Sequence, residues 1–245
     1  MVHKWQKIIK LYTALIQTRT SSKRLRGKVL LKILNLEVFR IVYNRVLKSK
    51  FISKAIILTT TLKADDLLVK ICKKNKIPYF RGSNTNVLKR YFDASEKHKL
   101  KNIVRITSDC PLVDPKIIDQ LCIKFENNKF DYISNVIKPT FPDGLDVEIF
   151  NFETLKNTYI NCKKKTEKEH VTTKMIQNKS LKKYNLKLNK NFYNYRVTLD
   201  TLDDFKKIKK IFEKEKSIFK PNLITVLKEI NKNKDQYKHK RPNYS

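Results

Sequence analysis

The sequence predicts an α/β fold in which a largely parallel β-sheet is flanked by helices. Short apolar runs alternate with amphipathic segments along the chain, a pattern typical of βαβ units. The chain has 245 residues, of which 40% are hydrophobic, and it can therefore bury one sizeable core. Its three glycines, Gly27, Gly82 and Gly144, all fall in loops rich in charged or hydroxyl side chains. Glycine suits places where the backbone turns tightly or approaches a ligand, so these three loops are candidate binding loops.

The individual elements follow from the same alternation. Strands are predicted over residues 11–16, 54–60, 77–80, 102–107, 131–135, 145–150, 184–188 and 194–199. Helices are predicted over residues 37–49, 65–75, 86–98, 115–127, 152–162, 167–178 and 202–215. The helix at residue 115 has a clear start, because Asp114 can cap it and Pro115 suits its first position. Asp65 and Asp66 stand where a helix macrodipole favours negative charge.

The chain is predicted to form a single domain over residues 1–220. Residues 221–245 are expected to add one helix after Pro221 and then a polar, basic tail. No run of about 18 apolar residues occurs, so no segment is expected to cross a membrane. Lysines interrupt the apolar part of the N-terminus, and no small-residue cleavage site follows it. This argues against a signal peptide and predicts a cytoplasmic protein.

The charge and the cysteines argue against several classes of protein. The formal net charge is +32, but the lysines are spread almost evenly along the chain. Because clustered charge rather than total charge marks a nucleic-acid surface, we expect a lysine coat that serves solubility and no nucleic-acid partner. The four cysteines form no C-x-x-C pair, so neither a zinc site nor a disulfide framework is indicated.

The loop after the first predicted strand, "QTRTSSKRLRGK", concentrates positive charge and hydroxyl groups. Ligands of open α/β sheets bind beyond the carboxyl ends of the strands, which is where this loop lies. Arg19, Arg24 and Lys28 can neutralise phosphate oxygens, while Ser21 and Ser22 can donate hydrogen bonds. The G-x-x-x-x-G-K-[ST] pattern of a Walker A loop is absent. The alternative is a solvated basic loop without a ligand.

Two aspartates follow strands that are distant in the sequence. Asp109 comes after the strand at 102–107, in "RITSDCPLVDP", and Asp200 ends the predicted strand at 194–199. Mg²⁺ takes one or two carboxylates together with phosphate oxygens, so the pair is a candidate site for Mg²⁺. Read alone, Asp200 serves equally well as the N-cap of the following helix.

The segments "FPDGLDVE" and "TEKEHVTTK" offer further polar groups. Their charged side chains suit hydrogen bonds to a polyhydroxylated substrate; they are Asp143, Asp146, Glu148, Glu169 and His170. A lone histidine such as His170 is more often a structural surface residue. The sequence contains no arrangement typical of a Ser-His-Asp triad or a Cys-His pair, so covalent catalysis is not indicated.

Six motifs stand in order along the chain: "ALIQTRTSSKRLRGKVL", "FRGSNTNVLKRY", "VRITSDCPLVDP", "FPDGLDVEIF", "EKEHVT" and "RVTLDTLDDF". Together they resemble the cytidylyltransferase family of spore coat polysaccharide biosynthesis protein F, which is related to the 3-deoxy-manno-octulosonate and acylneuraminate cytidylyltransferases. The resemblance implies a glycosyltransferase-A-like (nucleotide-diphospho-sugar transferase) fold with a Rossmann-like mixed, mainly parallel sheet. It also implies transfer of CMP from CTP to a sialic-acid-like or ulosonic acid acceptor, with release of pyrophosphate, for surface polysaccharide or glycan biosynthesis.

By this resemblance the first loop cradles the triphosphate of CTP, and Arg19, Lys28 and Asp109 are the catalytic residues. The loop positions that match the family are Arg19, Ser22, Arg24, Leu25, Gly27 and Lys28. Three positions depart from the family pattern, because Thr18 replaces an alanine, Ser21 a glycine and Arg26 a proline. Loss of a proline makes a loop less rigid.

The resemblance also implies roles for residues in the other motifs. Expected contacts to the nucleotide are Arg81, Gly82, Ser83 and Ser108, the last of which replaces a glycine. Mg²⁺ is expected on Asp109 and Asp200. The sugar side is expected to include Asp143, Gly144, Asp146, Glu169 and His170. Arg105 and Arg196 either pair with a sugar carboxylate or form ion pairs within the protein. A homodimer is expected.

Other functions stay open at this stage. A glycosyltransferase-A-type enzyme would consume a nucleotide-sugar, usually with a D-x-D metal motif, which "SDCP" lacks. An inactive nucleotide-binding homologue would bind CTP without turnover, consistent with the altered first loop. A nucleic-acid binder would show an affinity that falls steeply with salt.

Overall fold

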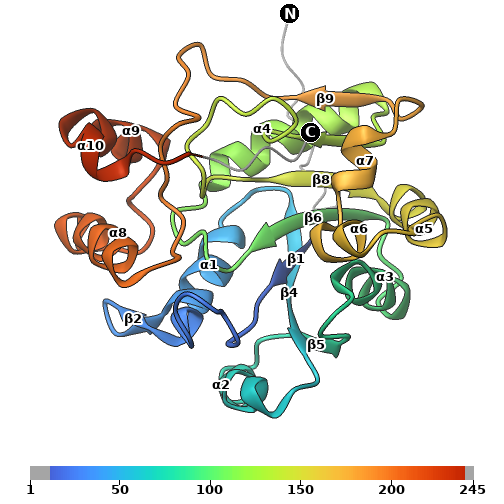
Figure 1. Ribbon diagram of the computed structural model, residues 1–245, viewed down its shortest axis with the longest axis horizontal. Helices are drawn as coiled ribbons and strands as arrows, with labels where there is room; N and C mark the ends of the chain where they lie inside the picture. The colour runs from blue at the N-terminus through green and yellow to red at the C-terminus, as the bar shows by residue number, and fades with distance from the viewer. Residues whose placement is uncertain (1–11, 241–245) are drawn as a thin grey trace, which may run out of the picture.

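A computed structural model describes residues 12–240 and contains a seven-stranded sheet with helices on both faces (Figure 1). Its strands are β1 (Tyr12–Gln17), β4 (Ile52–Thr60), β5 (Tyr79–Gly82), β6 (Asn102–Thr107), β7 (Tyr132–Ser134), β8 (Glu148–Asn151) and β9 (Lys183–Asn185). They lie in the order β5-β4-β1-β6-β8-β7-β9. All neighbouring strands are parallel except that β8 runs antiparallel to β6 and β7. The predicted mixed, mainly parallel sheet is confirmed.

Helices connect the strands and cover the sheet. They are α1 (Val38–Val46), α2 (Asp66–Lys74), α3 (Val87–Lys97), α4 (Pro115–Asn128), α5 (Phe152–Ile160), α6 (Lys165–His170), α7 (Thr173–Gln177), α8 (Leu202–Glu215), α9 (Leu223–Lys232) and α10 (Lys234–Tyr237). Short 3₁₀ helices, η1 (Lys28–Leu30) and η2 (Lys63–Asp65), follow β1 and β4. In Figure 1, α8, α9 and α10 lie at the left of the view and α3, α5, α6 and α7 at the right.

The apolar strand residues divide between two cores, one on each face of the sheet. In β1, Ala14 and Ile16 pack into the core that includes α1, α4, α8 and α9, whereas Leu15 packs into the core beneath α3 and α5. Successive side chains of a strand point to opposite faces, so a strand buried on both faces needs an unbroken apolar run. This is why β1, β4 and β6 were recognisable in the sequence.

Most predicted elements are confirmed, including residues 102–107 and 202–215 at the predicted bounds. The strand predicted over 194–199 is wrong. Its backbone bonds only short stretches of its neighbours: Val197 N–H donates to the Asp143 carbonyl (2.7 Å), Leu199 N–H to the Asp109 carbonyl (2.8 Å) and Arg196 N–H to the Tyr237 carbonyl (2.9 Å). Because its neighbours are loops rather than strands, no hydrogen-bonded ladder continues along it.

Two local features of the structure also differ from the prediction. Residues 167–178 form two helices, α6 and α7, because Val171 takes a left-handed φ of 55° between them. A small hairpin, β2 (Lys32–Ile33) and β3 (Leu36–Glu37), was not predicted. Its turn residues, Leu34 and Asn35, both have positive φ, as a two-residue hairpin turn requires.

Some predictions concern the two ends of the chain. Residue 11 of the first strand, most of the N-terminal segment judged against a signal peptide, and residues 241–245 of the basic tail lie outside the described residues. Within residues 12–240, none of the helices combines the length and the apolar character that crossing a membrane requires.

Candidate active site

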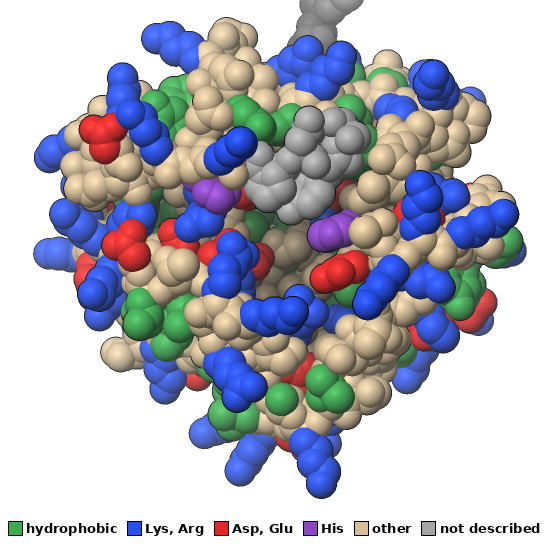
Figure 2. Space-filling view, in the orientation of Figure 1, with side chains coloured by type: hydrophobic (Ala, Val, Ile, Leu, Met, Phe, Trp, Pro, Cys, Tyr) green, Lys and Arg blue, Asp and Glu red, His purple; other side chains and the backbone are tan. Residues whose placement is uncertain are grey.

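The candidate site lies where the carboxyl ends of β1, β4 and β6 meet. Figure 2 shows a hollow near the centre of this face, bordered by acidic and basic side chains and by histidines. The first loop leaves β1 here and closes on itself, because Gly27 N–H donates to the carbonyl of Thr20 (2.9 Å). Gly27 has a φ of 67°, and η1 begins directly after it with Lys28. The loop is therefore a closed turn that delivers Lys28 to the edge of the sheet.

A buried aspartate that sequence reasoning assigned only to a helix start holds this loop. Asp65 accepts hydrogen bonds from the N–H and hydroxyl of Thr20 (2.8 and 2.7 Å) and from the N–H of Thr60 (3.1 Å), and it also bonds the Thr60 hydroxyl. It thereby ties the loop after β1 to the end of β4. Burial favours protonation, but these hydrogen bonds outweigh it and hold the pKa of Asp65 below its ordinary 3.8.

Replacing Asp65 with asparagine is expected to lower the free energy of unfolding by about 2–4 kcal/mol, because an amide group would face donors that the carboxylate now accepts. Urea denaturation at pH 7 measures this loss. The folded-state pKa lies below the unfolded value, so the contribution of Asp65 is present above about pH 4 and is lost as the pH falls further. Asp66→Asn, at an exposed neighbour, is the matched control and should change stability by less than about 1 kcal/mol. Equal losses would contradict the anchoring role.

The structure brings Asp109 and Asp200 together around Lys28. The Lys28 ammonium lies 2.8 Å from Asp109 Oδ2 and 2.9 Å from Asp200 Oδ1, and its side chain is only 9% exposed. The backbone explains this proximity, because the bond from Leu199 N–H to the Asp109 carbonyl places the next residue, Asp200, beside β6. Burial acts to lower the pKa of Lys28, but the two carboxylates outweigh it and raise that pKa above 10.5. In turn, the ammonium holds the pKa of Asp109 below 3.8 against the effect of burial.

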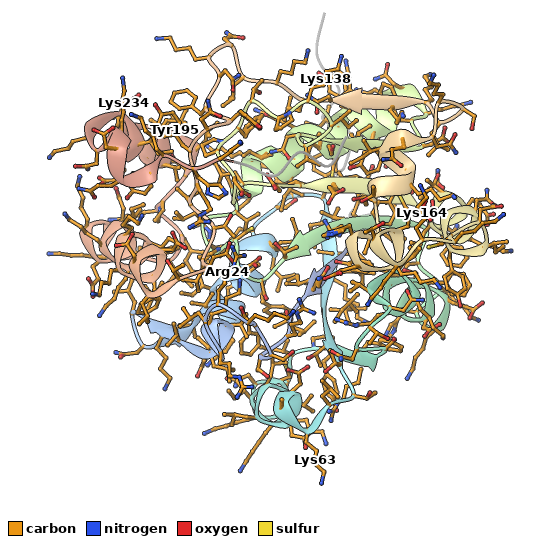
Figure 3. The ribbon with its side chains drawn as sticks, in the orientation of Figure 1. Arg24, Lys63, Lys138, Lys164, Tyr195 and Lys234 are labelled. Carbon is orange, nitrogen blue, oxygen red and sulfur yellow. The ribbon has the colours of Figure 1, made fainter. Side chains whose placement is uncertain are left out.

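The other polar residues of the first loop differ in how exposed they are and in whether they contact this cluster. The Arg24 guanidinium lies 2.8 Å from Asp200 Oδ2 but remains 61% exposed, near the middle of the face in Figure 3. Arg19 and Ser22 are half-buried, whereas Ser21 is exposed. Ser21 and Ser22 lie within the closed turn and Arg19 directly precedes it, and all three carry donors that suit an anion. Ser108 is buried, and its N–H continues the sheet by donating to Gln17.

The loop after β5 forms another part of the rim. Arg81 donates to the carbonyls of Thr60 (2.8 Å) and Leu62 (2.9 Å) and pairs with Asp66 (2.8 Å). A side chain at Gly82 would meet Cγ of Arg90 at 2.8 Å, which explains the glycine there. The neighbouring residue, Ser83, uses its hydroxyl to accept the N–H of Asn86.

The motif around Asp143 packs against the segment that carries Asp200. Asp143 N–H donates to the Tyr195 carbonyl (2.9 Å), and the Thr198 hydroxyl donates to Asp143 (3.1 Å). Asp146 is half-buried in the same loop. The structure therefore places the loop that is predicted to bind the sugar beside Asp200, which is predicted to bind the metal.

Replacing Gly144 with alanine is expected to lower the free energy of unfolding by about 3 kcal/mol. Its φ is 107°, and an added Cβ would lie 2.7 Å from backbone atoms of Val197 and Thr198, which have little freedom to move. Gly27 is the matched control: its φ is also positive, but nothing lies within 4 Å of its added Cβ. Gly27→Ala should cost only about 1–2 kcal/mol. Equal urea-denaturation losses in the two variants would contradict the packing argument.

Some sequence-predicted residues have partners within the protein. Glu148 is buried and bonds both Arg105 on β6 and the Tyr132 hydroxyl (2.6 Å), so both of its oxygens are engaged. Arg196 donates to both oxygens of Asp204 at 3.0 Å and lies 3.8 Å from Asp200. For both arginines the ion-pair alternative is what the structure shows.

Glu169 and His170 lie at the end of α6 and are exposed. Val171, which follows them, takes a φ of 55° and a ψ of −57° and is buried in the core beneath α3. Thr172 N–H donates to the His170 carbonyl (2.5 Å), which closes a three-residue turn of a rare and strained kind. Burial of the Val171 side chain therefore fixes the direction in which the backbone continues after His170.

The carboxylate pair fits a hard cation. Asp109 and Asp200 already share one cation, the Lys28 ammonium, and supply the oxygen donors that Mg²⁺ prefers. Within the described residues, no group of three or more His, Cys, Asp or Glu side chains could hold a metal ion. In the wild-type protein the Lys28 ammonium already neutralises the pair, so the site fits a metal that arrives with a nucleotide whose phosphates complete the coordination.

Comparison with known proteins identifies relatives that agree with the family resemblance found in the sequence. A cytidylyltransferase family model matches residues 13–242. Spore coat polysaccharide biosynthesis protein SpsF of Bacillus subtilis is 31% identical over 234 residues, covering 90% of this chain and 94% of that protein. A cytidylyltransferase structure from Leptospira borgpetersenii superimposes with a TM-score of 0.87 at 30% identity, covering 96% of this chain and 99% of that one. A CMP-2-keto-3-deoxy-manno-octonic acid synthetase complexed with CTP superimposes with a TM-score of 0.66 at 13% identity, over 83% of this chain and 99% of that one, which shows a shared fold.

Proposed function

This chain belongs to the cytidylyltransferase family, and on that premise we propose that it transfers CMP from CTP to a hydroxyl group of an acidic sugar. The observation that carries the proposal is the convergence of Lys28, Asp109 and Asp200 at the ends of β1 and β6, beside a loop rich in arginine and serine. A cationic loop next to paired carboxylates suits a metal-nucleotide complex rather than a neutral ligand.

The transfer is an in-line displacement at phosphorus. The acceptor oxygen forms a bond to the α-phosphorus, the bond from that phosphorus to the bridging oxygen of the β-phosphate breaks, and pyrophosphate leaves while the hydroxyl proton passes to solvent. Such a reaction depends mainly on positioning and on stabilisation of charge. A divalent ion held by Asp109 and Asp200 would neutralise charge on the α-phosphate.

The basic residues of the first loop would act on the leaving group. Arg24 and Lys28 lie beside the carboxylate pair and can transfer their hydrogen bonds from Asp109 and Asp200 to phosphate oxygens. Ser22, within the closed turn, and Arg19, directly before it, can bind the outer phosphates. Arg81, Gly82 and Ser83 form the rim on which the nucleoside would rest. The positively charged groups offset the charge that develops on pyrophosphate.

An acidic sugar is the acceptor that the relatives favour. The structural neighbour named for an octulosonic acid shares the fold, and the relative named for spore coat polysaccharide supports a product destined for surface glycans. Asp143, Asp146 and His170 supply groups that suit sugar hydroxyls. We further propose a homodimeric, cytoplasmic enzyme, which light scattering and fractionation would test.

The proposal is tested by pyrophosphate release from CTP, with UTP, ATP and GTP as nucleotide controls. The acceptors are an eight-carbon ulosonic acid, a nine-carbon sialic acid, a hexose 6-phosphate and a neutral hexose, each with Mg²⁺ or with a chelator. We expect release with CTP, an anionic acceptor and Mg²⁺ together. Depletion of a UDP-sugar instead would indicate a glycosyltransferase, and CTP binding without release under any condition would indicate an inactive homologue.

A further inference from the structure

Residues 237–239 do not extend away as part of a separate tail but lie beside the chain that leads to the candidate active site. Arg196 N–H donates to the Tyr237 carbonyl (2.9 Å), and His239 N–H donates to the Asn194 carbonyl (2.8 Å). Between these bonds, Tyr195 and Lys238 form an antiparallel bridge. The segment from Tyr237 to His239 is therefore paired, residue by residue, with the chain that leads to Asp200.

A buried side chain fixes this segment in place. Tyr237 is only 3% exposed and packs into the core that contains α8 and α9. The Lys207 ammonium lies 5.6 Å from the centre of its ring and also donates to the carbonyl of Gln236 (2.7 Å). Burial of a tyrosine ring contributes about 2 kcal/mol, so the pairing with residues 194–196 rests on an anchored element.

The paired segments border an open cavity of about 700 Å³, a size typical of small-molecule sites. It is lined by Asn191, Asn194, Tyr195, Lys238, His239 and Lys240. Among these described lining residues none carries a carboxylate, although Lys238 pairs with Asp235 outside the cavity at 2.7 Å. Figure 3 shows Tyr195 on the same side of the molecule as Lys234, beside α9 and α10.

The cavity adjoins the catalytic cluster. His239 Nδ1 lies 3.4 Å from a terminal nitrogen of Arg196, and that nitrogen lies 3.8 Å from Asp200 Oδ2. The opposite oxygen of Asp200 faces Lys28. Arg24 of the first loop also contacts Asp200 Oδ2, at 2.8 Å, so the cavity lies next to the site proposed for the triphosphate, and a ligand in the cavity would lie beside the nucleotide.

The composition of the lining indicates what it binds. Asparagine amides donate and accept hydrogen bonds, as sugar hydroxyls do, and an aromatic ring offers an apolar face to a sugar ring. Lys240 forms no ion pair within the described residues, so its charge is available to an anion. Burial and the Arg196 guanidinium lower the pKa of His239, which keeps its imidazole neutral near pH 7 as a hydrogen-bonding group.

From these contacts we propose that the cavity between residues 191–195 and 238–240 binds the acceptor, an anionic polyhydroxylated molecule whose carboxylate or phosphate contacts Lys238 and Lys240. This inference rests on the proposed nucleotidyl transfer and identifies where its second substrate binds. The residues predicted for the sugar side, such as Asp143, then border the reacting hydroxyl rather than the anionic group.

The test is the double variant Lys238→Ala/Lys240→Ala, compared with Lys232→Ala/Lys234→Ala, which removes the same charge from the same part of the chain outside this cavity. At saturating CTP, the first variant should raise the KM for the anionic acceptor about 10–100-fold while the KM for CTP changes less than about twofold. The control should leave both constants near wild type. Sugar-acid and sugar-phosphate acceptors distinguish a carboxylate from a phosphate as the bound group, and the neutral hexose should give no release with wild type or with either variant.

Direct calorimetric binding of the same four acceptors to nucleotide-free protein separates this inference from the proposed function. Binding of an anionic acceptor by wild type, weakened in the Lys238/Lys240 variant alone, supports the site even if no turnover occurs. Unchanged acceptor binding in that variant, an equal loss of CTP affinity, or no acceptor binding by wild type would each overturn the assignment.

Discussion

Asp109→Asn is expected to reduce pyrophosphate release from CTP by about 1,000-fold or more while the protein remains folded. Asparagine keeps an oxygen that can accept from Lys28, so the local packing survives. It removes the negative charge that, with Asp200, would hold a divalent ion against the α-phosphate. Initial rates at saturating CTP and acceptor measure the effect, with circular dichroism as the check on folding.

Asp93→Asn is the matched control for this substitution. Asp93 pairs with Lys89 at 2.7 Å and its side chain is 29% exposed, whereas Asp109 pairs with Lys28 at 2.8 Å and is 28% exposed. The two aspartates are equally exposed and each loses an ion pair with a lysine, but only Asp109 adjoins Asp200. If Asp109→Asn released pyrophosphate at the rate of Asp93→Asn, the metal-binding assignment would be wrong.

Much of the fold was predictable because buried strands and partly buried helices have different patterns of apolar residues in this sequence. Strands such as β1 are covered on both faces and are mostly apolar, while α8 is covered on one side and shows helical spacing. Residues 194–199 have the composition of a strand but lie against loops. Whether residues 194–199 form a strand depends on whether the fold places another strand beside them. The sequence of these six residues does not show this.

The candidate site was predictable where function depends on strand ends. Asp109 follows strand β6 as predicted, whereas Asp200 follows an irregular segment instead of the predicted strand; the structure nevertheless brings both within reach of one ammonium group. The role of Asp65 was missed, because an aspartate before a helix usually signals a cap. Its contacts with Thr20 join residues 45 positions apart, and such contacts leave no local pattern.

Sequence-based prediction also failed for residues 237–239, because their contacts are likewise with residues distant in the sequence. Their polar composition led to the expectation of a basic tail beyond residue 230. One buried ring, Tyr237, and two backbone hydrogen bonds to residues 194–196 are enough to bring them beside the chain that leads to the active site. Backbone pairing does not depend on side-chain type, so a lysine-rich segment that is paired in this way has the same sequence pattern as a solvated tail.

Replacing Lys28 with methionine is expected to lower the free energy of unfolding by about 3–5 kcal/mol in the absence of divalent ions. Methionine retains the length and apolar stem of lysine, but the carboxylates of Asp109 and Asp200 would then face each other without a cation between them. Activity should fall about 100–1,000-fold, since the variant also loses a group that would contact the leaving pyrophosphate.

The same variant tests the assignment of the carboxylate pair without any turnover. A divalent ion can occupy the place of the lost ammonium, so Mn²⁺ or Mg²⁺ at about 100 times its dissociation constant should restore about 2.7 kcal/mol. In the wild-type protein Lys28 already neutralises the pair, so nucleotide-free protein should gain much less from the metal. Lys32→Met removes an exposed lysine from the adjacent strand, 3.9 Å from Glu37, and should behave as wild type. Thermal unfolding with and without metal gives the comparison: a Lys28→Met protein that is as stable as wild type, or that responds no more strongly to Mn²⁺, would show that the two aspartates do not form a cation site.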